Sequence, residues 1–120
     1  MGERHYIERD GKPVAVPFRE WVAWMFCDPH RQVAATRIAK GVDVSTVFLG
    51  LDHSFGGGPP ILYETLVFGG PLDGQGQRTC TREQAVERHK QWVAHANEAE
   101  CRNPTVLDES EQIADLFQED

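Results

Sequence analysis

The chain has 120 residues, of which 40% are hydrophobic and 26% charged, so its size and composition fit one globular domain and exclude most multidomain enzymes. All of the net charge of −7 lies near the C-terminal end: residues 98–120 hold eight acidic side chains and one basic side chain, whereas residues 1–97 hold eleven of each. Nucleic-acid binding depends on Lys and Arg that neutralise phosphates, so a neutral body with an acidic end argues against DNA or RNA as a partner.

The first predicted elements are a hairpin and a short helix. Residues 5–8 and 13–16 are short β-type runs on either side of Asp10-Gly11, a dipeptide typical of hairpin turns. Pro17 suits the first turn of a helix that ends before Asp28-Pro29. The apolar residues of this helix recur at helical spacing: Phe18, Trp21, Val22 and Met25. We expect a short amphipathic helix whose tryptophans contribute to the core.

The middle of the chain is predicted to be a β-meander. Residues 32–39 and 42–51 are rich in β-forming side chains and are separated by Lys40-Gly41, so they should pair antiparallel. Residues 62–68 have the same character and should form the next strand. These runs supply the central strands of an antiparallel sheet.

A longer helix is predicted near the C-terminal end. Thr81 and Gln84 have the spacing of a capping box, in which each side chain satisfies a backbone amide at a helix start, and the helix should run over residues 82–97. The sequence therefore predicts an α+β domain over residues 1–99, with an antiparallel sheet of about four to five strands and two helices packed on one face. Residues 100–120 are expected to form an acidic, mobile tail.

One polar cluster is predicted within this arrangement. Strand alternation places His53 and Glu64 in rows of apolar side chains, and helical spacing places His89 on the apolar stripe of the C-terminal helix. If that helix packs on the sheet, the three side chains converge. We favour a buried hydrogen-bonded network, because a buried carboxylate needs partners. The alternative is a metal site with His53, Glu64 and His89 as ligands and Asp52 as a fourth ligand or as their orienting partner.

Two glycine-rich links, residues 54–60 and 69–76, flank the third strand of the meander. Glycine and proline often serve only to make turns, but loops held by a rigid scaffold also carry binding sites. The first link runs into a strand and not into a helix, which argues against a nucleotide-hydrolysing P-loop. The remaining hypothesis is a nucleotide or signalling-metabolite site between the two links, with these contact residues: Asp52, His53, Phe55, Gly56, Gly57, Gly70 and Arg78.

The acidic end contains a compact apolar cluster. Ile113, Leu116 and Phe117 have the spacing of one helical face, which favours docking into a groove of another protein, and the surrounding acidic residues favour a basic partner. The alternative is a solvated appendage, because a segment of this composition buries too little apolar surface to fold alone. Pairing of an exposed strand edge with a second copy is a further route to a partner.

The cysteines and the hydropathy pattern bear on the cellular setting. Cys27, Cys80 and Cys101 form neither a C-x-x-C pair nor an even disulfide set, so we expect free thiols in a reducing compartment. No apolar run reaches the length of a membrane-spanning helix, and residues 1–4 open no signal-peptide core. We therefore expect a cytoplasmic protein without a membrane partner.

A three-part pattern in the middle of the chain carries a family resemblance. Residues 44–53 read VSTVFLGLDH, residues 55–60 read FGGGPP and residues 63–70 read YETLVFGG. Over roughly residues 18–95 the chain resembles a family of small bacteriophage and prophage-associated proteins with no established activity. The resemblance implies an accessory protein acting in a bacterial cytoplasm, and it implies no cofactor and no catalytic residue.

The sequence contains no motif that names a reaction. Together with the resemblance, this favours a non-enzymatic accessory protein that binds a host or phage protein, without a cofactor. Two alternatives remain: the small-molecule binder that uses the glycine-rich links, and a metal-dependent enzyme that uses His53, Glu64 and His89.

Overall fold

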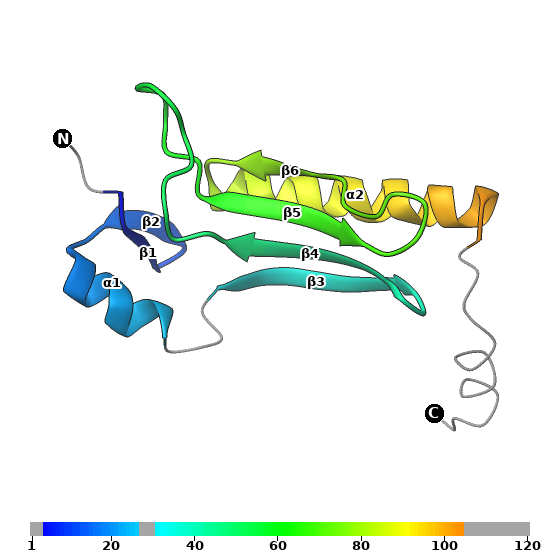
Figure 1. The fold of residues 1–120 in the computed structure, drawn as a ribbon, viewed down its shortest axis with the longest axis horizontal. Helices are drawn as coiled ribbons and strands as arrows, with labels where there is room; N and C mark the ends of the chain where they lie inside the picture. The colour runs from blue at the N-terminus through cyan, green and yellow to red at the C-terminus, as the bar shows by residue number, and fades with distance from the viewer. Residues whose placement is uncertain (1–3, 27–30, 105–120) are drawn as a thin grey trace.

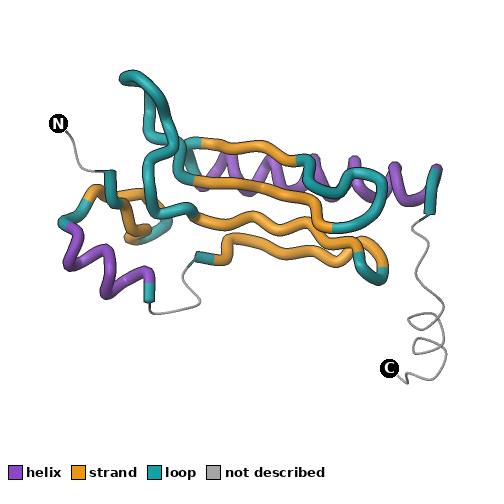
Figure 2. The backbone as a smooth tube through the Cα atoms, viewed as in Figure 1, coloured by secondary structure: helices purple, strands orange, loops and turns teal. Residues whose placement is uncertain are grey.

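The computed structural model describes residues 4–26 and 31–104, which form an α+β fold. A four-stranded antiparallel sheet in the order β3-β4-β5-β6 carries helix α2 on one face, and a two-stranded hairpin stands with α1 at one end of the sheet (Figures 1 and 2). The elements are β1 (Tyr6–Arg9), β2 (Lys12–Ala15), α1 (Phe18–Met25), β3 (Gln32–Ala39), β4 (Val42–Phe48), β5 (Tyr63–Phe68), β6 (Gly76–Thr79) and α2 (Arg82–Arg102). Among the described residues, neither helix is long and apolar enough to cross a membrane.

The N-terminal hairpin and helix form as predicted. Asp10 and Gly11 both have positive φ, 55° and 77°, as a tight hairpin turn with right-handed strand twist requires. In α1 the Trp21 indole donates a hydrogen bond to the Gly50 carbonyl oxygen at 2.9 Å, and Trp24 packs edge-on against Phe48 with ring centroids 5.5 Å apart. Both tryptophans are half-buried, so they attach α1 to the end of the sheet.

The sheet contains one strand that the sequence pattern does not indicate. Residues 76–79 of β6 are polar apart from the glycine, yet they pair antiparallel with β5. Gly76 begins this strand. Only glycine fits at this position, because a Cβ there would lie 2.0 Å from the Thr65 carbonyl oxygen. The second glycine-rich link is therefore shorter than expected, and its last residue is part of the sheet.

Helix α2 covers most of one face of the sheet, whereas α1 packs mainly beside β1. Helix α1 is only eight residues long and reaches the same core at the end of the sheet, where Trp24 packs on Phe48. The capping box at Thr81 and Gln84 is present, as predicted. The helix continues to Arg102, beyond the predicted end at residue 97, and Glu98 and Arg102 form an ion pair in its last turn.

The two faces of the sheet differ in burial. On β4 and β5 the side chains that face α2 are fully buried: Val42, Val44, Thr46, Phe48, Tyr63, Thr65 and Val67. The opposite side, here called the open face, carries Asp43, Ser45 and Val47 from β4 and Glu64, Leu66 and Phe68 from β5. In Figure 1 the open face is turned to the viewer and α2 runs behind the sheet.

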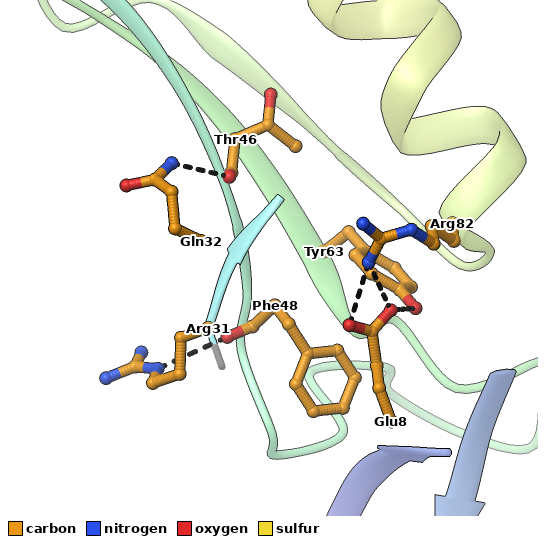
Figure 3. A network of polar contacts seen from close by, with 7 residues as sticks. All are labelled: Glu8, Arg31, Gln32, Thr46, Phe48, Tyr63 and Arg82. Atoms are coloured by element: carbon orange, nitrogen blue, oxygen red, sulfur yellow. Dashed lines mark hydrogen bonds and ion pairs between the residues drawn. The ribbon is translucent and has the colours of Figure 1, made fainter. Parts of the chain in front are cut away.

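A single carboxylate joins the hairpin to the rest of the fold. The side chain of Glu8 on β1 is 8% exposed and accepts hydrogen bonds from the Tyr63 hydroxyl at 2.5 Å and from Arg82 Nη1 at 2.9 and 3.0 Å (Figure 3). Burial and the negative charge of Glu8 raise the pKa of the Tyr63 phenol, so it stays protonated and keeps donating. Glu8 therefore connects β1, β5 and the first turn of α2.

The Glu8 contact predicts a large difference between two Glu→Ala substitutions. Glu8→Ala should lower the free energy of unfolding by about 2–3 kcal/mol, because it leaves a buried hydroxyl and a half-buried guanidinium without their acceptor. Glu64→Ala removes the more exposed pair with Arg78 on the open face and should cost about 1 kcal/mol or less. Urea denaturation of both variants measures this difference, and equal losses would contradict the role given to Glu8.

Candidate functional site

The structure does not bring His53, Glu64 and His89 together. His89 is buried between α2 and the sheet, whereas Glu64 lies on the open face and accepts a hydrogen bond from Arg78 at 3.1 Å. His53 belongs to the link between β4 and β5, where its amide donates to the Ile61 carbonyl oxygen. The predicted convergence is wrong, because the sheet separates Glu64 from His89.

The error comes from the choice of strand face. Strand alternation back from His53 puts Leu51, Leu49 and Val47 in the predicted apolar row. The buried row of β4 instead contains Val44, Thr46 and Phe48. Thr46 belongs to the buried row because its hydroxyl bonds to His89, while its methyl group and β-branched shape suit a packed strand. The alternation was visible in the sequence, but the polarity of the buried threonines hid which phase of it faces inward.

His89 forms a buried network with threonines from three strands. Its Nε2 lies 2.9 Å from the Thr36 hydroxyl and its Nδ1 lies 2.8 Å from the Thr46 hydroxyl, which is itself 2.7 Å from the hydroxyl of Thr65. A neutral imidazole fits these contacts, since one ring nitrogen donates and the other accepts. Burial lowers the pKa of His89, so the neutral form is favoured. A buried polar network that contains His89 does join α2 to the sheet, as predicted. Its other members are threonines, and not the predicted His53 and Glu64.

The metal interpretation finds no support in the described residues. No group of three or more His, Cys, Asp or Glu side chains is placed there to hold a metal ion. The two ring nitrogens of His89 already contact hydroxyl groups. Asp52, the proposed additional ligand, instead accepts hydrogen bonds from backbone amides.

The histidine network predicts a pH dependence of stability. The unfolded chain protonates His89 near its ordinary pKa of 6.5, whereas the folded chain does so only at lower pH. The free energy of unfolding should therefore fall as the pH drops from about 7.5 to 5.5, because the unfolded state binds more protons. His89→Asn should flatten this slope relative to wild type, and His95→Asn, at an exposed position, is the control for the substitution itself. Denaturant titrations at both pH values measure the slopes, and identical slopes in both variants would exclude His89 as their source.

The residues proposed for a small-molecule site are spread over three places. Asp52, His53, Phe55, Gly56 and Gly57 lie in the link before β5, whereas Gly70 lies in the link after it. The six-residue strand between them is about 20 Å long. Arg78 lies on the open face opposite Glu64. The two glycine-rich links therefore do not share a pocket.

The link before β5 forms a loop with a tethered neck. Asp52 Oδ1 accepts hydrogen bonds from the Ser54 amide at 2.8 Å and the Ile61 amide at 3.0 Å, and Arg4 Nη2 donates to the Asp52 carbonyl oxygen at 2.8 Å. Desolvation alone would raise the pKa of the Asp52 carboxyl, but these amides and the charge of Arg4 outweigh it and lower the pKa. Residues 53–61 are called the Phe55 loop below.

The Phe55 loop presents one aromatic side chain to solvent. Phe55 is 98% exposed, the largest exposure among the large hydrophobic side chains of the described residues. Gly56 and Gly57 follow with φ of 72° and 83°, in a conformation that favours glycine, and no atom would lie within 4 Å of a Cβ at either position. The loop projects away from the sheet (Figures 1 and 2). Phe55 is thus held out from the body of the protein.

A groove of about 470 Å³ lies between β6 and the C-terminal half of α2. Trp92 Nε1 donates to Gln77 Oε1 at 3.3 Å within it, and the Trp92 ring contacts His95 edge-on. Leu72 and Gln75 of the second glycine-rich link also line the groove. The sequence pattern does not indicate this site, because it does not predict β6 and so does not place Gln77 beside the helix.

Some predicted features lie outside the described residues. These are the cysteine Cys27 and residues 105–120 of the predicted acidic tail, with the apolar cluster Ile113, Leu116 and Phe117. Residues 100–102, which were assigned to the tail, belong to α2. The other two cysteines, Cys80 and Cys101, are free thiols, as expected.

Comparisons of the chain with protein-family models, with curated proteins and with solved structures found no match. Its function is therefore inferred from the groups that this chain itself presents. Two features on the surface are open to a binding partner: the exposed Phe55 and the groove beside Trp92.

Proposed function

We propose that this protein is a non-enzymatic binding module whose Phe55 loop inserts its aromatic ring into an apolar pocket of a partner protein. The observation that carries the proposal is the nearly complete exposure of Phe55 on a loop whose neck is held by Asp52. Burying a phenylalanine side chain stabilises a complex by roughly 1.5–3 kcal/mol. Ordering of the neck in the free protein reduces the entropy lost on binding.

The chemistry of the loop favours a protein over a phosphate-bearing partner. Residues 53–61 contain no Lys and no Arg. Nucleic acids and anionic membranes are bound through clusters of cationic side chains. A lone aromatic anchor in an uncharged loop instead fits the kind of residue that dominates protein–protein interfaces when it enters a pocket.

The sequence supplies the proposed setting and partner. Its resemblance to phage and prophage-associated proteins supports an accessory role in a bacterial cytoplasm, with a host or phage protein as the partner. The acidic C-terminal end supports a partner with a basic surface, because complementary charge speeds association. The loop would then provide the anchor, and the charge would guide the encounter.

Substituting Phe55 tests the anchor directly. Phe55→Ser should weaken binding to the partner at least tenfold and leave the free energy of unfolding within about 0.5 kcal/mol of wild type, because the side chain makes no core contact. Phe68→Ser is the matched control: it removes a half-exposed phenylalanine from the open face and should leave binding intact.

The partner is sought with a photo-crosslinking side chain at position 55, in a lysate of a bacterial host. The proposal is supported by a protein that crosslinks at position 55. Wild type and Phe68→Ser should retain this protein, and Phe55→Ser should lose it. Purified partner then gives the Kd of each variant. Equal Kd values for Phe55→Ser and wild type would sink the proposal.

A small-molecule function is the second candidate, and the groove beside Trp92 is the observation that favours it. Its lining combines an indole ring with glutamine side chains from β6 and α2. An aromatic ring can stack on the indole, and amide groups can hydrogen-bond to the polar edges of a base. A nucleotide or signalling metabolite with a planar base fits this chemistry.

Thermal shift measurements with mono-, di- and cyclic nucleotides test this second candidate. A ligand at a hundred times its Kd should stabilise the protein by about 2.7 kcal/mol and raise the melting temperature accordingly. His95→Ala, in the groove, should reduce the shift, whereas Glu87→Ala, on α2 outside the groove, should not. If no nucleotide raises the melting temperature, the proposal that the groove binds nucleotides is wrong.

A further inference from the structure

We propose that β3 pairs with β3 of a second copy of this chain, antiparallel about a two-fold axis at Thr36, so that Ala35 of each copy lies opposite Arg37 of the other. This inference is independent of the Phe55 anchor. It starts from backbone groups on the outer edge of the sheet that no strand of residues 4–26 or 31–104 pairs with.

Hydrogen bonds on β4 show which backbone groups of β3 point outward. The Phe48 amide donates to the carbonyl oxygen of Arg31, just before β3. The Leu49 amide points the other way and donates to the carbonyl oxygen of Leu62, just before β5. The direction of the backbone N–H and C=O groups alternates along a strand, so those of Thr46 and Val44 also point toward β3. Their partners on β3 are Ala34 and Thr36.

The residues between those partners therefore face away from the sheet. Ala35 and Arg37 direct their N–H and C=O groups to the free edge of β3. In an antiparallel ladder, two residues can exchange both of their hydrogen bonds only when both direct these groups toward each other. Placing Ala35 opposite Arg37 of the second copy satisfies this condition twice, with about four hydrogen bonds in total.

Two register shifts restrict where a second strand can pair. The pairing of β3 with β4 shifts between Gln32 and Ala34 and again between Arg37 and Ala39. Such irregularities twist a strand and end regular pairing, so the segment from Ala34 to Arg37 is the part that can accept a flat partner. A segment this short admits few registers, and the one centred on Thr36 uses the outward groups of both Ala35 and Arg37.

The side chains of this segment suit close approach of an identical strand. Ala34, Ala35 and Thr36 are small, and Arg37 is the only charged residue of β3. In the proposed register, Arg37 faces an alanine and not the other arginine, so no like charges lie directly opposite. Arg37 also keeps its ion pair with Asp43 of its own chain at 3.0 Å.

The opposite edge of the sheet is less suited to pairing. β6 has four residues, against eight in β3, and it begins with Gly76. Glycine weakens a strand because it adds backbone entropy and no cross-strand packing, and short edge strands are a common protection against pairing. The second copy is therefore assigned to β3.

Sedimentation equilibrium of the full chain, from about 1 to 500 μM, tests the pairing. Wild type should show a monomer–dimer equilibrium within this range. Ala35→Lys should weaken the dimer at least tenfold, because the lysine lies opposite Arg37 of the other copy. Ala35→Glu should tighten it, because a carboxylate there faces the same guanidinium.

Ser45→Lys is the matched control. Ser45 pairs with Ala35 across β3 and β4, so this lysine lies on the same face but one strand away from the edge, and the dimer should persist. Far-UV circular dichroism checks that each variant folds; Ala35 is exposed, so its variants should.

Amide hydrogen exchange on the wild type gives a reading that needs no variant. The Ala35 and Arg37 amides should become protected as the protein concentration rises, whereas the edge amides of β6 should not. A chain that stays monomeric at 500 μM would overturn the proposal. A dimer that responds to neither Ala35 variant, or that protects the β6 edge instead, would overturn it as well.

Discussion

The fold depends on one histidine whose two ring nitrogens are both engaged. His89 reaches from α2 to threonine hydroxyls on β3 and β4, and the second of these reaches on to β5. Because a buried donor or acceptor without a partner is costly, this network allows only one rotation of α2 about its axis and one face of the sheet toward it. The open face follows from that choice, whereas the strand order places β3 at the edge of the sheet.

A second polar contact extends the same body to the N-terminal elements. Tyr63 packs its ring against Phe48 in the core, and its hydroxyl donates to Glu8 of the hairpin. The two residues before the hairpin contact the neck of the Phe55 loop: Arg4 donates to the Asp52 carbonyl oxygen, and His5 forms a β-bridge with Leu51. The exposed Phe55 therefore stands on a chain of contacts that begins in the core, which is the property an anchor residue needs.

The surfaces that carry the proposals lie on different parts of this body. The Phe55 loop precedes β5, the groove beside Trp92 runs along β6 and α2, and the free edge belongs to β3 at the far side of the sheet. Pairing of two copies through β3 would leave both loops and both grooves accessible. A dimer would then present two anchors, which raises avidity for a partner with two sites.

Local patterns in the sequence determined the elements. The Asp10-Gly11 turn and the capping box at Thr81 depend on neighbours in the chain, so these elements could be predicted, as could the α+β class. Only the tertiary structure decided which strand face is buried, because that depends on whether His89 supplies partners to threonines 43 and 53 residues away. It likewise decided the Glu8–Arg82 contact, across 74 residues, and the strand β6, which β5 stabilises in spite of its polar sequence.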